Sequence, residues 1–362
     1  MKLSNDSHVH ITIDDDLKLS AQGFALYRQG SNIDRITFLA LNPASKVMSH
    51  TYNQNSKCLY LKEYFGEKGY AGFSLDYSGE ISADAFLEQI KRAFRAGFDC
   101  WKIIEGKPKM QKSLGFCVDD EIYDKAYSFA EQNGFPVIMH VADPDWLWTA
   151  ELKNDYPTAK YYKDQAVNVL KKHPNLKLNL AHFGFMSDSP DNVVALLEKF
   201  PTLSFDTVPA TEELFVIAKN PKVWREIFIK YSTRYMFGSD RGNHTAKGIT
   251  DEQFHKIYPT DSAPYERKLF ELNGWYDARS TWPNSTNPFG TELYGLNLPE
   301  YAVDNIFYNN FLAFMPKRKA VDYDIFNEYI KKEFSLPKLS KYHDEDYKTL
   351  KEFINNKKEP LS

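Results

Sequence analysis

The sequence lacks several features that mark common classes of protein. Its 362 residues include only three cysteines, widely spaced and without a CxxC pair, which argues against a disulfide framework and indicates a reducing compartment. No apolar run approaches the roughly 18 residues that a membrane helix needs. The first residues also lack the apolar segment of a secretion signal. We therefore expect a cytoplasmic protein without a membrane partner.

A strong charge of one sign is missing as well. The chain has 45 Lys+Arg against 49 Asp+Glu, a formal net charge of −4, and it shows no basic stripe of the kind that binds nucleic acid. Glycine-rich phosphate loops of the GxGxxG or Walker type are absent, which argues against nucleotide binding. What the chain does contain is 43% hydrophobic and 15% aromatic residues, enough for a large folded core.

Two kinds of segment alternate along the chain. Short runs rich in β-branched and aromatic residues predict strands, and several are apolar on both faces, as in a parallel sheet covered by helices. Longer segments repeat apolar residues at i, i+3 and i+4, which predicts helices packed on one face. Alternation of this kind indicates βαβ units. The predicted strands are 7–13, 35–41, 71–76, 100–104, 136–140, 176–182, 203–206 and 235–239, and the predicted helices include 83–96, 122–133, 162–172, 192–200 and 223–230.

Eight such units fit an α/β fold of the (β/α)8 TIM-barrel type, which typically takes about 250 residues. An open, doubly wound sheet is the alternative, because periodicity does not distinguish the two. The extra length is predicted to lie in loop insertions at 143–159 and 241–299, followed by a closing helix over 299–315. We therefore divide the chain into a barrel domain, 1–315, and a charged helical extension packed on the barrel, 316–362.

Residues that commonly bind metals end several of the predicted strands. His8 and His10 are two residues apart on the first strand, so both rings can face one point. His140, His182 and Asp240 end the fifth, sixth and eighth strands. In a barrel these strand ends meet at the C-terminal mouth, where barrel active sites are built. Three imidazoles and one carboxylate there suit zinc or another divalent transition metal, with His182 as a fourth histidine nearby.

These motifs make the chain similar to a known family. It resembles the amidohydrolase superfamily, and more closely its amidohydrolase-2 branch of TIM-barrel metal-dependent hydrolases and aminocarboxymuconate-semialdehyde-type decarboxylases. The resemblance extends over about residues 6–315 and leaves the tail unmatched. It rests on Asp6-Ser-His8-Val-His10, the strand-ending His140, Ala181-His182-Phe-Gly184, Phe237-Gly-Ser-Asp240 and the closing Ile306-Phe-Tyr-Asn309.

The resemblance implies a role for each matching residue. His8, His10, His140 and Asp240 are implied as the ligands of one divalent metal, zinc with manganese as the alternative. Asp240 is also implied as the acceptor of a proton from water. His182 is implied to act on substrate or water instead of being an obligatory ligand. Homodimers are common in this branch, so a homodimer is expected.

Other polar residues at the predicted mouth are assigned from their position. Lys102, on the fourth strand, is expected to hold a substrate carboxylate without itself being carboxylated, and an ordinary solvent-facing lysine is the alternative. Arg241 and His244, after the eighth strand, are placed to bind an anionic substrate group. Asp206, at the end of the seventh strand, either lines the pocket or stabilises a turn.

Three functions fit these residues. The first is a metal-dependent hydrolase that uses an activated water on an ester, lactone or amide bond of a small anionic substrate. The second is a non-oxidative decarboxylase of a small carboxylic acid on the same scaffold, which needs the same metal ligands. The third, a barrel that keeps its metal only for structure or binding, is disfavoured because the ligand set and His182 are complete.

Overall fold

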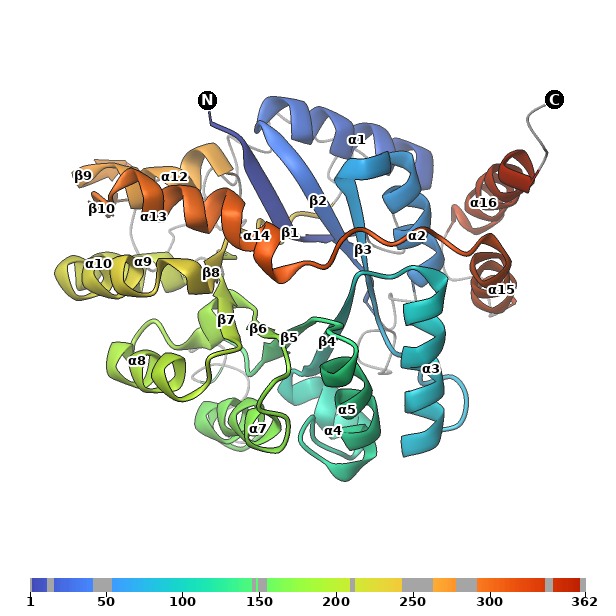
Figure 1. Cartoon of the computed structure of the whole chain (residues 1–362), viewed down its shortest axis with the longest axis horizontal. Helices are drawn as coiled ribbons and strands as arrows, with labels where there is room; N and C mark the ends of the chain where they lie inside the picture. The colour runs from blue at the N-terminus through green and yellow to red at the C-terminus, as the bar shows by residue number, and fades with distance from the viewer. Residues whose placement is uncertain are drawn as a thin grey trace.

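The computed structural model describes residues 2–11, 16–41, 54–144, 148, 155–208, 212–242, 263–277, 292–335 and 341–358. Eight parallel strands pair in sequence order from β1 to β8, and helices surround them (Figure 1). The strands are β1 Ser4–His10, β2 Ile33–Leu39, β3 Gly69–Phe73, β4 Cys100–Gly106, β5 Val137–Val141, β6 Leu178–Leu180, β7 Leu203–Asp206 and β8 Tyr235–Met236.

The last strand meets the first, which closes the barrel. Ser7 N donates to Phe237 O at 3.1 Å, and Asp240 N donates to His8 O at 2.8 Å. A parallel bridge between Val9 and Arg241 extends this seam. The predicted TIM barrel is thus confirmed, and the doubly wound alternative is wrong. Closure matters for the site because it brings the residues after β8 beside the end of β1.

The outer helices follow from local sequence signals where these are strong. Helix α3 begins and ends at the predicted residues, because Ser82 accepts a hydrogen bond from Ala85 N at its start and Gly97 adopts φ +96° at its end. Its buried face carries Phe86, Ile90 and Ala93. The helices around the barrel are α1 Leu17–Gly30, α2 Asn55–Tyr64, α3 Ala83–Ala96, α4 Pro108–Leu114, α5 Asp124–Gln132, α7 Ala159–Lys172, α8 Pro190–Lys199, α9 Glu212–Lys219 and α10 Pro221–Lys230.

Helix α2 was not among the predicted helices, and its burial explains why. Every residue from Asn55 to Lys62 is buried, so the helix has no polar face and no amphipathic period. It lies between the barrel strands and two helices of the C-terminal extension, α15 Tyr323–Glu333 and α16 His343–Lys358. A periodic pattern appears only where one face of a helix meets water.

The insertion after β8 contains more structure than expected. It holds helix α12 Ala263–Glu271 and a hairpin of two antiparallel strands, β9 Asn273–Asp277 and β10 Glu292–Leu296, and the hairpin was not predicted. The closing helix predicted over 299–315 is confirmed as one continuous helical run, made of α13 Glu300–Asp304, a π-helical turn at Asn305–Asn309 and α14 Asn310–Phe314. Most of the insertion, with His244, lies outside the described residues.

The C-terminal extension packs on the outside of the barrel against α1, α2 and α3 (Figure 1). Its Phe326, Ile330, Leu350 and Ile354 belong to the same hydrophobic cluster as the barrel core. Two of its carboxylates also bind the first residues of inner helices. Glu333 accepts from Ser56 N at 3.1 Å, and Asp346 accepts from Leu17 N at 2.9 Å.

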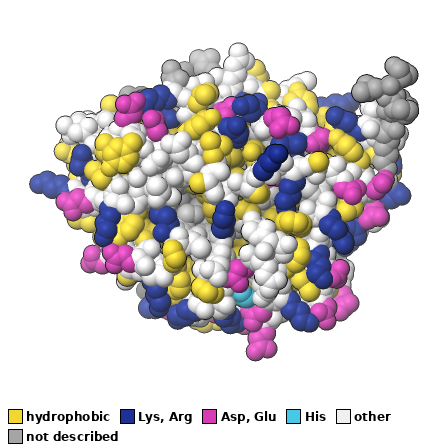
Figure 2. Space-filling view, in the orientation of Figure 1, with side chains coloured by type: hydrophobic (Ala, Val, Ile, Leu, Met, Phe, Trp, Pro, Cys, Tyr) yellow, Lys and Arg dark blue, Asp and Glu magenta, His cyan; other side chains and the backbone are white. Residues whose placement is uncertain are grey.

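Residues 316–322 cross the end of the barrel where the strands begin, and this end faces the viewer in Figure 1. Arg318 Nε donates to Gly69 O at 3.0 Å, and Lys319 N donates to Asp99 at 3.2 Å. On the same face, basic and acidic side chains are interspersed (Figure 2). Among the described helices, none is both long and apolar enough to cross a bilayer.

Candidate active site

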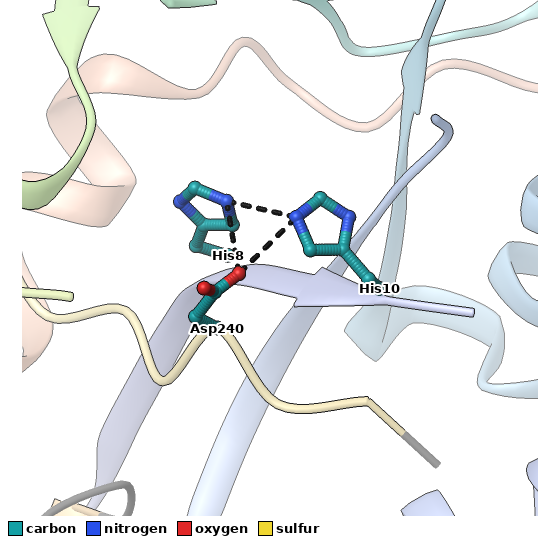
Figure 3. A group of neighbouring side chains, drawn as sticks. All are labelled: His8, His10 and Asp240. Atoms are coloured by element: carbon teal, nitrogen blue, oxygen red, sulfur yellow. Dashed lines mark hydrogen bonds and ion pairs between the residues drawn. The ribbon is translucent and has the colours of Figure 1, made fainter. Parts of the chain in front are cut away.

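Three side chains meet at the C-terminal mouth of the barrel (Figure 3). His8 Nε2 lies 3.1 Å from His10 Nε2, and Asp240 Oδ1 lies 3.6 Å from the first ring and 3.3 Å from the second. Both histidines stand on β1 at positions i and i+2, and Asp240 reaches them because β8 closes against β1. The structure therefore brings together three of the four predicted metal ligands.

The outer nitrogens of both rings are already bonded, which leaves the inner nitrogens as acceptors. His10 Nδ1 donates to Leu39 O at 2.8 Å, and a carbonyl oxygen can only accept. His8 Nδ1 bonds to the Asp206 carboxyl group, Oδ2, at 2.9 Å, and the Lys102 ammonium, which can only donate, lies 3.0 Å from His8 Nε2, so the ring proton is on Nδ1. Two imidazole lone pairs and a carboxylate oxygen therefore face one another at 3.1–3.6 Å. Such an arrangement is repulsive unless a cation or a proton lies among them.

A cation does lie beside this cluster. The Nζ of Lys102, on β4, is 3.0 Å from His8 Nε2, and Lys102 is 1% exposed. Burial lowers the pKa of Lys102, while the negative charges of Asp240 and Asp206 act in the opposite direction. The alternative of a solvent-facing lysine is wrong, because the side chain points into the barrel and contacts a cluster residue.

Asp240 is the most solvent-exposed residue of the three-residue cluster. Its side chain is 39% exposed, whereas that of His8 is fully buried and that of His10 is 12% exposed. Burial opposes its ionisation, but contact with His10 and the positive charge that the neighbouring imidazoles can carry lower the pKa of Asp240 well below its ordinary value. An ionised carboxylate thus faces the entrance, where a substrate arrives.

His182 and His140 lie next to each other at the same end of the barrel, close to the three-residue cluster. The rings of these two residues are 4.8 Å apart between centroids, and His182 is 5.6 Å from the His8 ring. Burial lowers the pKa of His182 well below its ordinary value, so this ring is neutral at pH 7. Its Nδ1 is buried without a hydrogen-bond partner among the described residues, which leaves a polar atom available to a ligand.

His140 does not join the three-residue cluster. Its Nε2 donates to Ala142 O at 3.0 Å and lies 3.5 Å from Asp143 Oδ1, so Nδ1 is the nitrogen left with a free lone pair. Burial, together with the charge of Lys107, lowers the pKa of His140 to about 4. Lys107 also binds Asp143 at 3.0 Å. The role of His140 as fourth ligand stays a prediction, and a coordinating His140 would use Nδ1.

Two buried aspartates support the cluster from outside it. Asp206 is fully buried at the end of β7 and contacts both His8 Nδ1 and His182 N. Asp6, on β1, accepts from Ser239 Oγ at 2.6 Å and from His8 N at 3.1 Å, which ties β1 to the segment that carries Asp240. From the sequence, Asp206 was predicted either to line the pocket or to stabilise a turn. Asp6 was part of the family motif, and no further role was predicted for it.

Arg241 directly follows Asp240, and its side chain packs on α1. Its guanidinium stacks over the ring of Tyr27 on α1, 4.3 Å from the centroid, and the residue is 5% exposed. Tyr27 donates in turn to Asp6 at 2.7 Å. Arg241 therefore packs against the residues that join β1 to the end of β8, and its contact with a substrate anion stays a prediction.

The donor set of the cluster fits a divalent transition metal. Imidazole nitrogens and a carboxylate oxygen are usual ligands of zinc, and the second nitrogen of a metal-bound histidine normally donates to a carboxylate or a backbone carbonyl. Both forms of support are present, at Asp206 for His8 and at Leu39 O for His10. The orphaned Nδ1 of His182 adds a further polar atom close to the same point.

A barrel with this cluster at its mouth is typical of one class of TIM-barrel enzymes, and comparison with known proteins assigns the class. The chain belongs to the amidohydrolase family, whose amidohydrolase-2 model matches residues 6–310. The match covers the barrel and leaves α15 and α16 outside it. No curated protein sequence matches the chain.

Solved structures share the fold at low sequence identity. One is 2,6-dihydroxybenzoate decarboxylase from Rhizobium, with TM-score 0.54, 12% identity and coverage of 86% of this chain and 98% of that one. A second is 4-oxalomesaconate hydratase from Rhodopseudomonas palustris, with TM-score 0.51, 16% identity and coverage of 88% and 85%. A third is a putative amidohydrolase from Staphylococcus aureus, with TM-score 0.50, 12% identity and coverage of 87% and 99%. The likeness concerns the fold.

Proposed function

We propose that this protein is a metal-dependent hydrolase that acts on an ester, lactone or amide bond of a small anionic substrate. The observation that carries the proposal is the convergence of three acceptors, His8 Nε2, His10 Nε2 and Asp240 Oδ1. The Nδ1 atom of each histidine ring is hydrogen-bonded on the opposite side, which fixes the orientation of both rings. A cation or a proton makes this arrangement favourable, and the family match supports a divalent metal as that cation.

The residues divide the chemistry among themselves. His8, His10, Asp240 and His140 would hold a divalent ion, which would polarise a carbonyl as a Lewis acid and make water more acidic. Asp240, ionised and open to the entrance, accepts the proton of the attacking water and passes it to the leaving group. His182, neutral and with Nδ1 unpaired, is available to hydrogen-bond the oxygen on which negative charge develops.

Positive charge at the mouth favours an anionic substrate. Lys102 contributes a buried ammonium next to the cluster, where a carboxylate of the substrate gains the most from a charge-assisted hydrogen bond. We propose that Lys102 stays unmodified and that the site takes one metal, zinc with manganese as the alternative. Arg241 is proposed as a second contact for the substrate anion.

The same lysine favours a second candidate function, a non-oxidative decarboxylase. A carboxylate held beside a cation and the Lys102 ammonium is also the group that leaves as CO₂ once the adjacent carbon has been protonated. The decarboxylase from Rhizobium has a similar fold at 12% identity, and this likeness supports the second candidate. Both functions use the same ligands, so an assay has to separate them.

Metal analysis followed by a substrate screen tests the proposal. Purified protein is expected to contain or take up close to one divalent ion per chain, and the loaded form is expected to hydrolyse an anionic ester, lactone or amide. Release of CO₂ from a small carboxylic acid, without hydrolysis, would establish the second candidate instead. Protein that binds no divalent ion at this cluster would contradict both.

A further inference from the structure

The fully buried Asp206 has a place in the site that the proposed function does not use. It ends β7, the strand beside β8, and its two carboxylate oxygens bond to residues at two different strand ends. Oδ2 accepts from His8 Nδ1 at 2.9 Å, and Oδ1 accepts from His182 N at 2.7 Å. One carboxylate therefore contacts both a candidate metal ligand and the backbone of the candidate catalytic histidine.

We infer that Asp206 is a positioning residue, which holds His8 in the tautomer that binds metal and at the same time holds the turn that presents His182. The inference rests on the proposed metal site, but not on the reaction that the site catalyses. It assigns to Asp206 neither contact with metal nor contact with substrate.

The tautomer follows from the geometry at His8. A neutral imidazole carries its proton on one nitrogen, and the other nitrogen offers the lone pair. Because Asp206 accepts at Nδ1, the proton stays there and Nε2 points its lone pair at His10 and Asp240. Lys102 Nζ, 3.0 Å from Nε2, donates to that same lone pair. Without the carboxylate, His8 can place its proton on Nε2, and the cluster then loses one metal-binding atom.

The second contact acts on an unusual stretch of backbone. His182 and Phe183 have φ angles of +56° and +53°, a left-handed conformation that is unfavourable for residues with a side chain. The hydrogen bond from His182 N to Asp206 stabilises this conformation at its first residue. This turn places the centroid of the His182 ring 4.8 Å from that of His140 and 5.6 Å from that of His8. Loss of the acceptor leaves a buried N–H unpaired at the point where the turn begins.

Asp206→Asn is the informative change, because it keeps the size of the side chain but leaves one oxygen acceptor for three donors, His8 Nδ1, His182 N and Val208 N. We expect it to weaken zinc binding by about 10- to 100-fold, as loss of such supporting contacts typically does. The measurement is competition for zinc against a chelator, with the dissociation constant of each variant compared with that of the original protein.

Asp99→Asn is a matched control. Asp99 is also fully buried, and it binds Lys62 at 2.8 Å at the opposite end of the barrel, before β4 begins. This control is expected to lower thermal stability but to leave the zinc dissociation constant unchanged. An unchanged zinc dissociation constant in folded Asp206→Asn would overturn the inference. An equal loss in Asp99→Asn would overturn it as well, because the effect would then be general destabilisation.

A second measurement does not depend on Asp206→Asn folding. In the original protein without metal, ¹⁵N NMR of the histidine rings, with the His8 signal assigned by its loss in His8→Gln, should show the His8 proton on Nδ1. A proton found on Nε2 would refute the inference even if zinc binds. If the protein binds no zinc while His8 carries its proton on Nδ1, the proposed function fails and the positioning role of Asp206 is retained.

Discussion

Replacing Lys102 by methionine should strengthen metal binding, because it removes a positive charge from the place where the metal is expected. Lys102 Nζ is 3.0 Å from His8 Nε2, which puts the ammonium within about 5 Å of an ion bound to that nitrogen at about 2.1 Å. With charges of +1 and +2 and an effective dielectric constant of 20, the repulsion is about 6–7 kcal/mol. Movement of the lysine relieves much of it. If only a fifth remains, about 1.4 kcal/mol, the affinity changes tenfold.

The effect should depend on pH in a defined direction. Burial lowers the pKa of Lys102 to about 8, so the side chain is mainly charged at pH 7 and mainly neutral at pH 9. We therefore expect Lys102→Met to bind zinc at least about tenfold more tightly at pH 7, with the difference shrinking above pH 8. Zinc competition titrations of both proteins from pH 6.5 to 9 measure this.

Lys107→Met is the control for general changes of charge at the mouth. The ammonium of Lys107 is already paired with Asp143 at 3.0 Å, so its removal should change the zinc affinity much less. Weaker zinc binding in Lys102→Met would refute the reasoning. It would show that Lys102 contributes to metal binding, as a carboxylated lysine does, and a stoichiometry that falls from two ions to one would identify that case.

Three further predictions concern other parts of the molecule. His182→Ala should retain the metal and turn over about 10²–10⁴-fold more slowly, since a positioned acid or base contributes a factor of that size. Asp240→Ala should lose both metal and turnover, and metal content and rate are measured on the same samples. Asp99→Ala should lower the free energy of unfolding in urea by about 3–5 kcal/mol, because it leaves the fully buried ammonium of Lys62 unpaired, and a loss below about 1 kcal/mol would contradict this. Burial raises the pKa of Glu333 to about 8, so this carboxyl loses its proton at a lower pH in the unfolded chain than in the folded protein. The free energy of unfolding should therefore fall as pH rises between about 4.5 and 8, by at most about 1.4 kcal/mol per pH unit. Glu333→Gln should remove this slope, and an unchanged slope would show that Glu333 is not its source.

Local signals in the sequence were sufficient for the order of strands and helices, and the two-residue spacing of His8 and His10 placed both rings on one face of β1. That order fitted a barrel and an open sheet alike, and the closure of β8 against β1 decided between them. Helix α3 was predicted to the residue, because its N-cap serine and C-terminal glycine act within a few positions along the chain. Features of this kind depend on neighbours in the sequence, and they can therefore be read without the fold.

The composition of the site was decided by tertiary structure. Asp206 contacts His8 across 198 positions of the chain, and the contact exists only because β7 and β1 stand in the same closed barrel. The direction of Lys102, towards the cluster and not towards solvent, likewise depends on which face of β4 points inward. Helix α2 lacks a period because the C-terminal helices cover it. A sequence states which side chains have metal-binding chemistry, but contacts between distant strands decide which nitrogen faces which oxygen.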